Sequence, residues 1–502
     1  MSMNRRSFLK AAGAAAAGAG LALPSLLGAS EWGAIPGGSP WNHSPRKILH
    51  CILPGGCSIW ENFWVTSDFD FAGYAEDVAS LGWSCAGSPN PPDQLLGFDY
   101  DQAEQEIYWG PATKPLWSSH ILDHSRMITQ TLSQGNPPHE LALPLMVGGR
   151  KLGDPKLASV AAAIERRFQS VQPRQTPYSC VIAPQTGETS LLRSLLTKCG
   201  MHPSWARPLL LKLGEGDSTL KQQLQRAGVT ASSDLLFNMY RSQYRDLLRF
   251  QGEGDPVRSA GFEAYDHAAN LLFSSDALDE VLSDELLEVE TSAPCAGNPP
   301  EPLLPNTTKA GLLLAAHLLS LPHAQGGMRY VAVVDGGLKP APGGVGPYDA
   351  HTSSNVAVTS ANLWNLLSHL SQIIQTPGPA FGIGASTPKI DLSDTVVVIT
   401  SEFGRTPTAK DGGGRDHWAT GFVALVIGDL VNRGISGALV DHSVASGYGY
   451  GPQDICALQM LLAGVWPFET EGFSAAGLSG ALRDDDETES GVVSKLQQKF
   501  LG

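Results

Sequence analysis

Short runs of β-branched and aliphatic residues recur along the chain, separated by stretches with apolar residues three and four positions apart. The runs predict buried strands and the three-and-four spacing predicts helices. The predicted strands are Lys47–Leu53, Met127–Thr131, Tyr178–Ala183, Tyr330–Val334, Thr395–Thr400 and Phe422–Ile427. The predicted helices include Lys309–Leu321, Asn362–Ile374 and a helix that Asp454 opens as an N-cap or first-turn acid and that ends at Leu462. This alternation predicts an α/β fold with a doubly wound, mostly parallel sheet.

Between residues 191 and 306 the pattern changes. Leu235–Phe250 and Tyr265–Glu290 carry apolar residues among charges at helical spacing, and Thr291–Asn306 is rich in Pro and Gly. We therefore expect a helical insertion or cap on the sheet. The expected organisation is a signal (1–30), a flexible lead (31–46), the first part of the α/β domain (47–190), the insertion (191–306) and the second part of the domain (307–502).

The N-terminus has the pattern of an export signal. Arg5 and Arg6 precede a run of Ala, Gly and Leu, and small residues follow at Gly28-Ala29-Ser30, where a signal peptidase could cut. A membrane-spanning helix needs about 20 strongly apolar residues, and this stretch is rich in Gly and Ala instead. We expect the twin-arginine export machinery as a partner, and the periplasm or the cell exterior as the destination.

Composition narrows the possible partners. The 502 residues are 42% hydrophobic and 17% charged, with a formal charge of −15. Such a chain can bury a large core, and it would repel a polyphosphate backbone, so nucleic-acid binding is not expected. No segment after the signal has the length and apolarity of a stable membrane span. The seven cysteines have no CxxC or zinc-site spacing, and in an oxidising compartment one or two disulfides are possible, with the pairing open.

The stretch from Thr395 to Trp418 holds the densest candidate chemistry. A predicted strand is followed by Glu402, Arg405, Asp416 and His417, among several glycines and prolines. Ligands of open α/β sheets bind outside the carboxyl ends of the strands, so these side chains suit a site there. The alternative is an ordinary solvated surface loop.

Several motifs together resemble one family. They are the twin-arginine start, a first strand ending in Gly55-Gly56, Tyr348-Asp349-Ala350-His351, Ser401-Glu402-Phe403-Gly404-Arg405-Thr406-Pro407 and Gly414-Arg415-Asp416-His417. The chain resembles the exported bacterial family called domain of unknown function 1501 from about Lys47 to Pro467. That family is similar to the sulfatases of the alkaline phosphatase superfamily. Where the family usually reads Trp-Asp-Thr-His, Tyr348 and Ala350 are departures.

The resemblance implies one or two divalent metal ions (Zn, Mn or Ca) at the strand ends, and hydrolysis of phosphate or sulfate esters in an anionic small molecule or polymer. The implied role of Arg405 is to grip the anionic substrate. The implied metal ligands are Glu61, Asp349, His351, Glu402, Asp416 and His417.

The nucleophile position of the sulfatases falls near Pro138-His139, where this chain has no Ser, Thr or Cys. His139 is the candidate catalytic residue there, as a ligand, a proton donor or a nucleophile. The alternative is an ordinary core or loop histidine. Ser58, Thr131 and Ser133 are further candidate nucleophiles, and Cys57 is expected to be a buried, inert thiol. Three functions remain open: an ester hydrolase, an inactive relative acting as a binding or scaffold protein, and a phosphomutase or transferase.

Overall fold

The computed structural model describes chiefly residues 33–200, 208–213, 295–296 and 306–502, apart from short gaps within the two long ranges. The helices predicted over 235–250 and 265–290 lie outside the described residues. The signal segment does as well.

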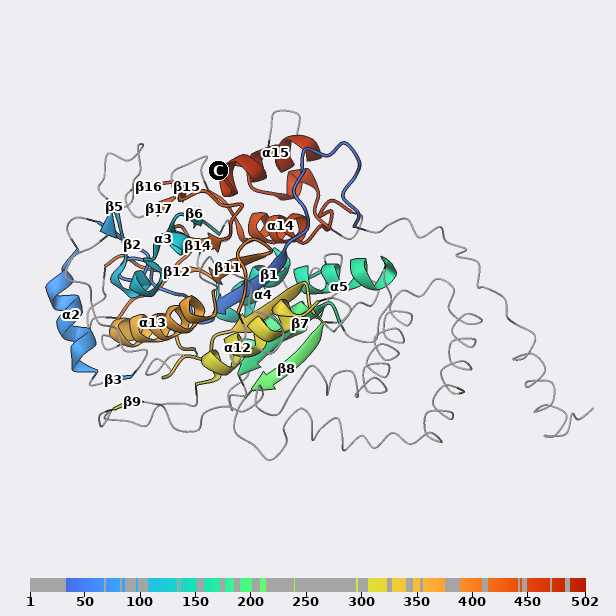
Figure 1. Ribbon diagram of the computed structural model, residues 1–502. Coiled ribbons are helices and arrows are strands. Elements are labelled where there is room, and N and C mark those ends of the chain that lie inside the picture. The colour runs from blue at the N-terminus through green and yellow to red at the C-terminus, as the bar shows by residue number, and fades with distance from the viewer. Residues whose placement is uncertain are drawn as a thin grey trace, which may run out of the picture.

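An eight-stranded sheet forms the centre, in the order β15-β6-β14-β11-β1-β10-β7-β8 (Figure 1). All neighbouring pairs are parallel except the two that involve β14, which runs against both β11 and β6. The prediction of a mostly parallel α/β sheet is confirmed. The strands are β1 (Lys47–Leu53), β6 (Ser125–Gln130), β7 (Ser179–Pro184), β8 (Leu209–Leu213), β10 (Tyr330–Val334), β11 (Thr395–Ser401), β14 (Phe422–Ile427) and β15 (Gly434–Ser436).

Helices cover both faces of this sheet, as the doubly wound prediction requires. On β7, the Ser179 hydroxyl donates to the carbonyl of Ala161 in α5. Ile182 of the same strand faces α12 instead, because a Cβ added to Gly311 of α12 would lie 3.5 Å from Ile182 Cγ2. Residues three positions apart on a strand point to opposite faces, so α5 and α12 lie on opposite sides. The main helices are α4 (His139–Gly148), α5 (Val160–Val171), α6 (Ser190–Cys199), α12 (Thr307–Ser320), α13 (Asn355–Ile373) and α14 (Pro452–Leu462).

The strands at the centre of the sheet are buried along their whole length, which explains their continuous apolar runs. His50 of β1 is a polar exception. Its Nδ1 lies 2.9 Å from the Tyr330 hydroxyl on β10 and its Nε2 lies 2.8 Å from Thr400 Oγ1 on β11. This side chain therefore links three adjacent strands and satisfies both of its ring nitrogens inside the core.

Part of the segment after residue 191 belongs to the central sheet. Both α6 and β8 lie after or across that position, and β8 is the edge strand of the central sheet. The segment predicted as a flexible lead also packs on the domain. Trp41 is buried, and the carbonyl of Gly33 accepts from the Trp466 amide at 2.7 Å.

Shorter elements surround the sheet. A small three-stranded sheet has the order β2-β5-β4 and lies near α2 and α13 (Figure 1). The other small strands form the pairs β12-β13, β16-β17 and β3-β9. Their bounds, with the remaining helices, are β2 (Trp64–Thr66), α2 (Phe71–Ser80), β3 (Ser84–Cys85), β4 (Leu96–Gly97), β5 (Ile107–Trp109), η1 (Pro111–Leu116), α3 (Ser119–Leu122), β9 (Cys295–Ala296), β12 (Gly404–Arg405), β13 (His417–Trp418), β16 (Leu439–Val440), β17 (Ser443–Val444), η3 (Ala475–Gly477) and α15 (Glu489–Phe500).

Within the described residues, no helix is both long and apolar enough to cross a membrane. Asp454 takes the predicted place in the first turn of α14, where its Oδ2 accepts from the Gly451 amide at 2.7 Å.

Candidate metal centre

The site lies at one edge of the central sheet. Strands β1, β6, β10 and β11 run in the same direction, so their carboxyl ends meet at that edge. The chain leaving β6 reaches His139 at the start of α4, and Asp349 and His351 lie between β10 and α13. The hairpin β12-β13 follows β11 and pairs Arg405 with His417.

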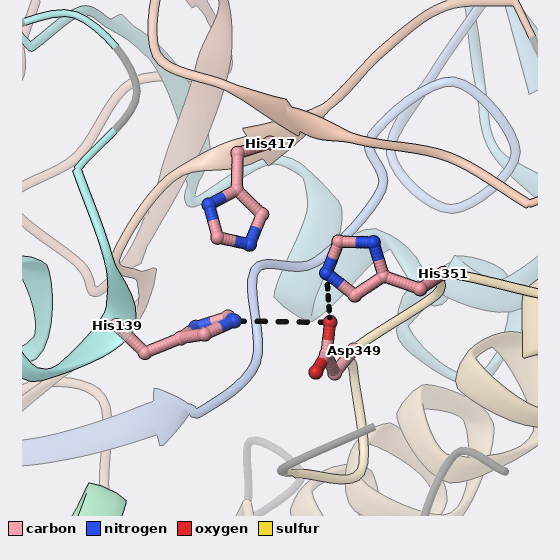
Figure 2. Close-up of side chains that lie close together, drawn as sticks. All are labelled: His139, Asp349, His351 and His417. Carbon is pink, nitrogen blue, oxygen red and sulfur yellow. Dashed lines mark ion pairs between the residues drawn. The ribbon is translucent and has the colours of Figure 1, made fainter. Parts of the chain in front are cut away.

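Four side chains converge there: His139, Asp349, His351 and His417 (Figure 2). Each offers one ligand atom, and these atoms all lie within 4.8 Å of one another. Asp349 Oδ1 lies 3.1 Å from His351 Nε2 and 3.7 Å from His139 Nε2. His139 and Asp349 are buried, whereas the two other histidines are partly exposed.

An oxygen outside the cluster lies near the Nδ1 atom of each imidazole. Glu402 Oε1 lies 2.8 Å from His139 Nδ1, and Asp416 Oδ1 lies 3.5 Å from His351 Nδ1. The Pro137 carbonyl lies 3.3 Å from His417 Nδ1. An acceptor at Nδ1 favours the tautomer protonated there and leaves the Nε2 lone pair for a ligand interaction. The Nε2 atoms of all three rings therefore face the cluster, and that of His351 also accepts from Arg405 Nη1 at 3.2 Å.

The charges of the site act differently on two of these rings. Burial acts to lower the pKa of His139, but the hydrogen bonds and negative charges of Asp349 and Glu402 outweigh it and raise the pKa to about 9. Burial and nearby positive charges, Arg405 foremost, lower the pKa of His417 to about 4. His417 is therefore neutral at physiological pH, and a metal bound to His139 would replace its proton.

Three of the six predicted ligands, Asp349, His351 and His417, belong to the cluster. The other three have different contacts. Glu402 and Asp416 hold the rings of His139 and His351, as described above. Glu61 pairs with Arg415 and accepts from the Ser58 hydroxyl, so its carboxylate is neutralised within the protein.

Arg405, the residue expected to grip an anionic substrate, lies inside the site. Its side chain is fully buried, and its Nε donates to the carbonyl of Gly56 at 3.0 Å. The terminal nitrogens donate to the carbonyls of Gly55 and Arg415, to His351 Nε2 and to Asp349 Oδ1. A guanidinium has five N–H donors, and all five are used inside the protein. In this arrangement Arg405 positions Asp349.

The departures from the family motifs have packing roles. Phe403, in the same motif as Glu402 and Arg405, is fully buried, with its ring centroid 4.2 Å from that of His417 and 4.9 Å from that of His139. The Tyr348 hydroxyl donates to the buried Asp335 carboxylate, which anchors the loop that carries Asp349.

Gly55 is required where the first strand meets this loop. Its φ is +116°, and a Cβ there would lie 2.7 Å from the backbone nitrogen of Asp349. Its own amide donates to Glu402 Oε1 at 2.7 Å. A side chain at this position would strain the backbone and displace Asp349.

The candidate nucleophiles are less available than the cluster. Ser58 is buried and donates to Glu61. Cys57 is buried, and burial raises the pKa of its thiol well above its usual value, as expected for an inert cysteine. Thr131 Oγ1 lies 3.4 Å from the Ala419 carbonyl. Ser133 lies outside the described residues.

The cluster could bind a divalent metal ion. The Nε2 atoms of His139 and His417 are buried, and Asp349 Oδ1 lies 3.7 Å from that of His139, beyond ordinary hydrogen-bond distance. Three imidazoles with one carboxylate are a familiar donor set for zinc. The ligand atoms, all within 4.8 Å of one another, would draw closer together to bind one zinc ion at Zn–N distances of about 2.0–2.1 Å. Among the described residues, the cluster suits one ion.

These features define the class of protein: an α/β protein with a histidine and aspartate cluster at the carboxyl ends of its strands. A family model described as "Protein of unknown function (DUF1501)" matches residues 117–466, and the chain belongs to this family. The match spans all four cluster residues. Residues 2–22 match the twin-arginine translocation signal, so the protein is exported by that pathway to the periplasm or beyond.

No curated protein matches the sequence. Among solved structures, the chain has a distant likeness to the PsFucS1 sulfatase from Pseudoalteromonas sp., with 10% identity and a TM-score of 0.29. The alignment covers 84% of this chain and 68% of the sulfatase. At that TM-score the two chains share too little geometry for the likeness to bear on function.

Proposed function

We propose that the protein is an exported, metal-dependent hydrolase of phosphate or sulfate esters, with His139, Asp349, His351 and His417 as the ligands of one divalent ion. One observation carries the proposal: three imidazole Nε2 atoms and a carboxylate oxygen face one another, while the Nδ1 atom of each ring lies near an outside acceptor. Structural histidines of a protein core have no need of this arrangement, whereas metal-binding histidines commonly have it.

The donor set favours zinc. Three nitrogen ligands suit zinc better than calcium, which takes six to eight oxygen ligands. When bound, such an ion supplies Lewis acidity that polarises an ester oxygen and stabilises developing negative charge. The chain itself supplies orientation: Glu402 and Asp416 hold the ligand rings, and Arg405 holds the Asp349 carboxylate.

Water is the nucleophile that this arrangement favours. Ser58 and Cys57 are buried next to the site, with the hydroxyl of Ser58 donated to Glu61 and the thiol of Cys57 held protonated by burial. Neither can readily form the covalent intermediate that a resident Ser or Cys nucleophile would give. The proposed reaction is therefore direct hydrolysis.

A second candidate is an exported protein that binds metal and does not catalyse. The observation in its favour is the burial of Arg405, because the residue expected to bind an anionic substrate is instead fully bonded within the protein. Metal binding without turnover of any ester would support this alternative.

The test is the metal content of the exported protein, measured by elemental mass spectrometry. Wild type is compared with the Asp349→Ala, His417→Ala double variant. A matched control, His120→Ala with Asp123→Ala, removes the same two groups at α3, where Asp123 is exposed. Aryl phosphate and aryl sulfate esters are then assayed with each protein and after treatment with a chelator.

We expect about one ion per chain in wild type and in the control, and none in the double variant. Ester hydrolysis that follows the metal content supports the hydrolase. Equal metal content in wild type and double variant, or the absence of metal from a folded wild-type protein exported in its own host, overturns the proposed site.

A further inference from the structure

Two cysteines lie directly opposite each other in an antiparallel strand pair. In the register of β3 and β9, Cys85 is the partner of Cys295. They are 210 positions apart in the sequence, and nothing in their spacing indicates that they meet. Residues directly opposite in an antiparallel pair share one face of the ladder.

The backbone spacing of such a pair suits a disulfide. Opposed residues of antiparallel strands have Cα atoms about 4.5 or 5.5 Å apart, depending on whether the pair is hydrogen-bonded. Disulfides bridge Cα atoms that are about 4.4–6.8 Å apart. Both kinds of antiparallel pair fall inside that window, so the register of β3 and β9 is compatible with a disulfide.

The other five cysteines are poor competitors. Cys51, Cys57, Cys180, Cys199 and Cys456 are all buried and free. Burial raises the pKa of each of these thiols, to about 12 for Cys199. The thiolate is the reactive form in disulfide exchange, so these five remain reduced in the folded protein.

We propose that Cys85 and Cys295 form the disulfide bond of the exported protein. The compartment to which the signal directs the chain permits disulfides. The two thiols lose two protons and two electrons as the sulfur–sulfur bond forms. A disulfide of an exported thiol oxidoreductase accepts both and becomes a dithiol. The bond would join β3 to β9.

The experiment counts thiols in protein isolated from the exported fraction. The protein is unfolded in iodoacetamide, with or without prior reduction, and its peptides are identified by mass spectrometry. We expect five alkylated cysteines without reductant and seven after reduction, and a peptide pair that joins Cys85 to Cys295. The linked pair should be lighter than its two reduced peptides by two hydrogen atoms.

Two comparisons isolate the cause. The Arg5→Lys, Arg6→Lys variant carries the same mature chain but stays in the reducing cytoplasm, and there we expect seven alkylated cysteines without reductant. The Cys85→Ser variant has six cysteines, and all six should be alkylated because Cys295 has lost its partner.

Alkylation of both Cys85 and Cys295 in unreduced, exported wild-type protein overturns the proposal, and so does a link from either of them to another cysteine. These readings require no metal and no substrate. The fate of the proposed hydrolase therefore does not affect them.

Discussion

The substitution Glu402→Gln tests whether a carboxylate outside the cluster supports metal binding. Glu402 Oε1 lies 2.8 Å from His139 Nδ1 and 2.7 Å from the Gly55 amide, and the side chain is fully buried. Glutamine keeps the size and one acceptor oxygen of this residue but removes its negative charge. The change therefore isolates the electrostatic part of the support for His139.

The expected magnitude follows from these two contacts. A hydrogen bond to a charged group contributes about 1.5–3 kcal/mol and a neutral one about 0.5–1.5 kcal/mol, so the loss is on the order of 1–1.5 kcal/mol. Because 1.4 kcal/mol corresponds to a tenfold change in affinity, we expect roughly tenfold weaker metal binding. Substitutions of comparable outer residues in metal sites weaken binding about tenfold to a hundredfold.

The assay is a competition titration of Zn²⁺ against a chromophoric chelator at neutral pH. Glu140→Gln is the matched control, because Glu140 is the next residue of α4 after His139 but is exposed. Circular dichroism confirms that each variant is folded. Equal Zn²⁺ affinity in wild type and Glu402→Gln, with both folded, would refute the supporting role of this carboxylate.

Further predictions concern three individual residues. Burial lowers the pKa of His50 to about 3, so between pH 6.5 and 3 the unfolded chain holds one more proton than the folded chain. Acidification in this range therefore lowers the free energy of unfolding by about 1.4 kcal/mol per pH unit. Denaturant melts at pH 7 and pH 5 should show a smaller loss of stability for His50→Gln than for wild type, and equal losses would contradict this. Burial raises the pKa of Asp454 to about 6, so this residue has the opposite sign, and its contribution to stability falls as pH rises from 3.8 to 6. Asp454→Ala also leaves two buried amides without their acceptor, and thermal melts should show a loss of about 1–3 kcal/mol per unsatisfied group; an unchanged melting temperature would contradict that role. Gly55→Ala should weaken metal binding by displacing Asp349. Gly38→Ala is the control, because Gly38 also has a positive φ (+91°) but no atom lies within 4 Å of the added Cβ, and this variant should bind metal like wild type. Equal metal affinity in both variants would show that the close approach at Gly55 is unimportant.

Much of the fold could be predicted from local pattern. The continuous apolar runs of β1, β10 and β11 correspond to the buried centre of the sheet, because a strand covered on both faces needs apolar residues at every position. The twin-arginine signal and the family motifs were likewise readable as local sequence. The reversed direction of β14 was not, since an apolar run has the same pattern in either direction.

The sequence by itself determined the strands, the export route and the residue types available for chemistry. Only the tertiary structure decided their roles. Glu402 contacts His139, which is 263 positions away in the sequence, and Arg405 donates hydrogen bonds to backbone carbonyls and to Asp349. The physical reason is that parallel strands joined by long crossovers bring distant loops to one edge of the sheet, and the distances between side chains there depend on packing that no local pattern encodes.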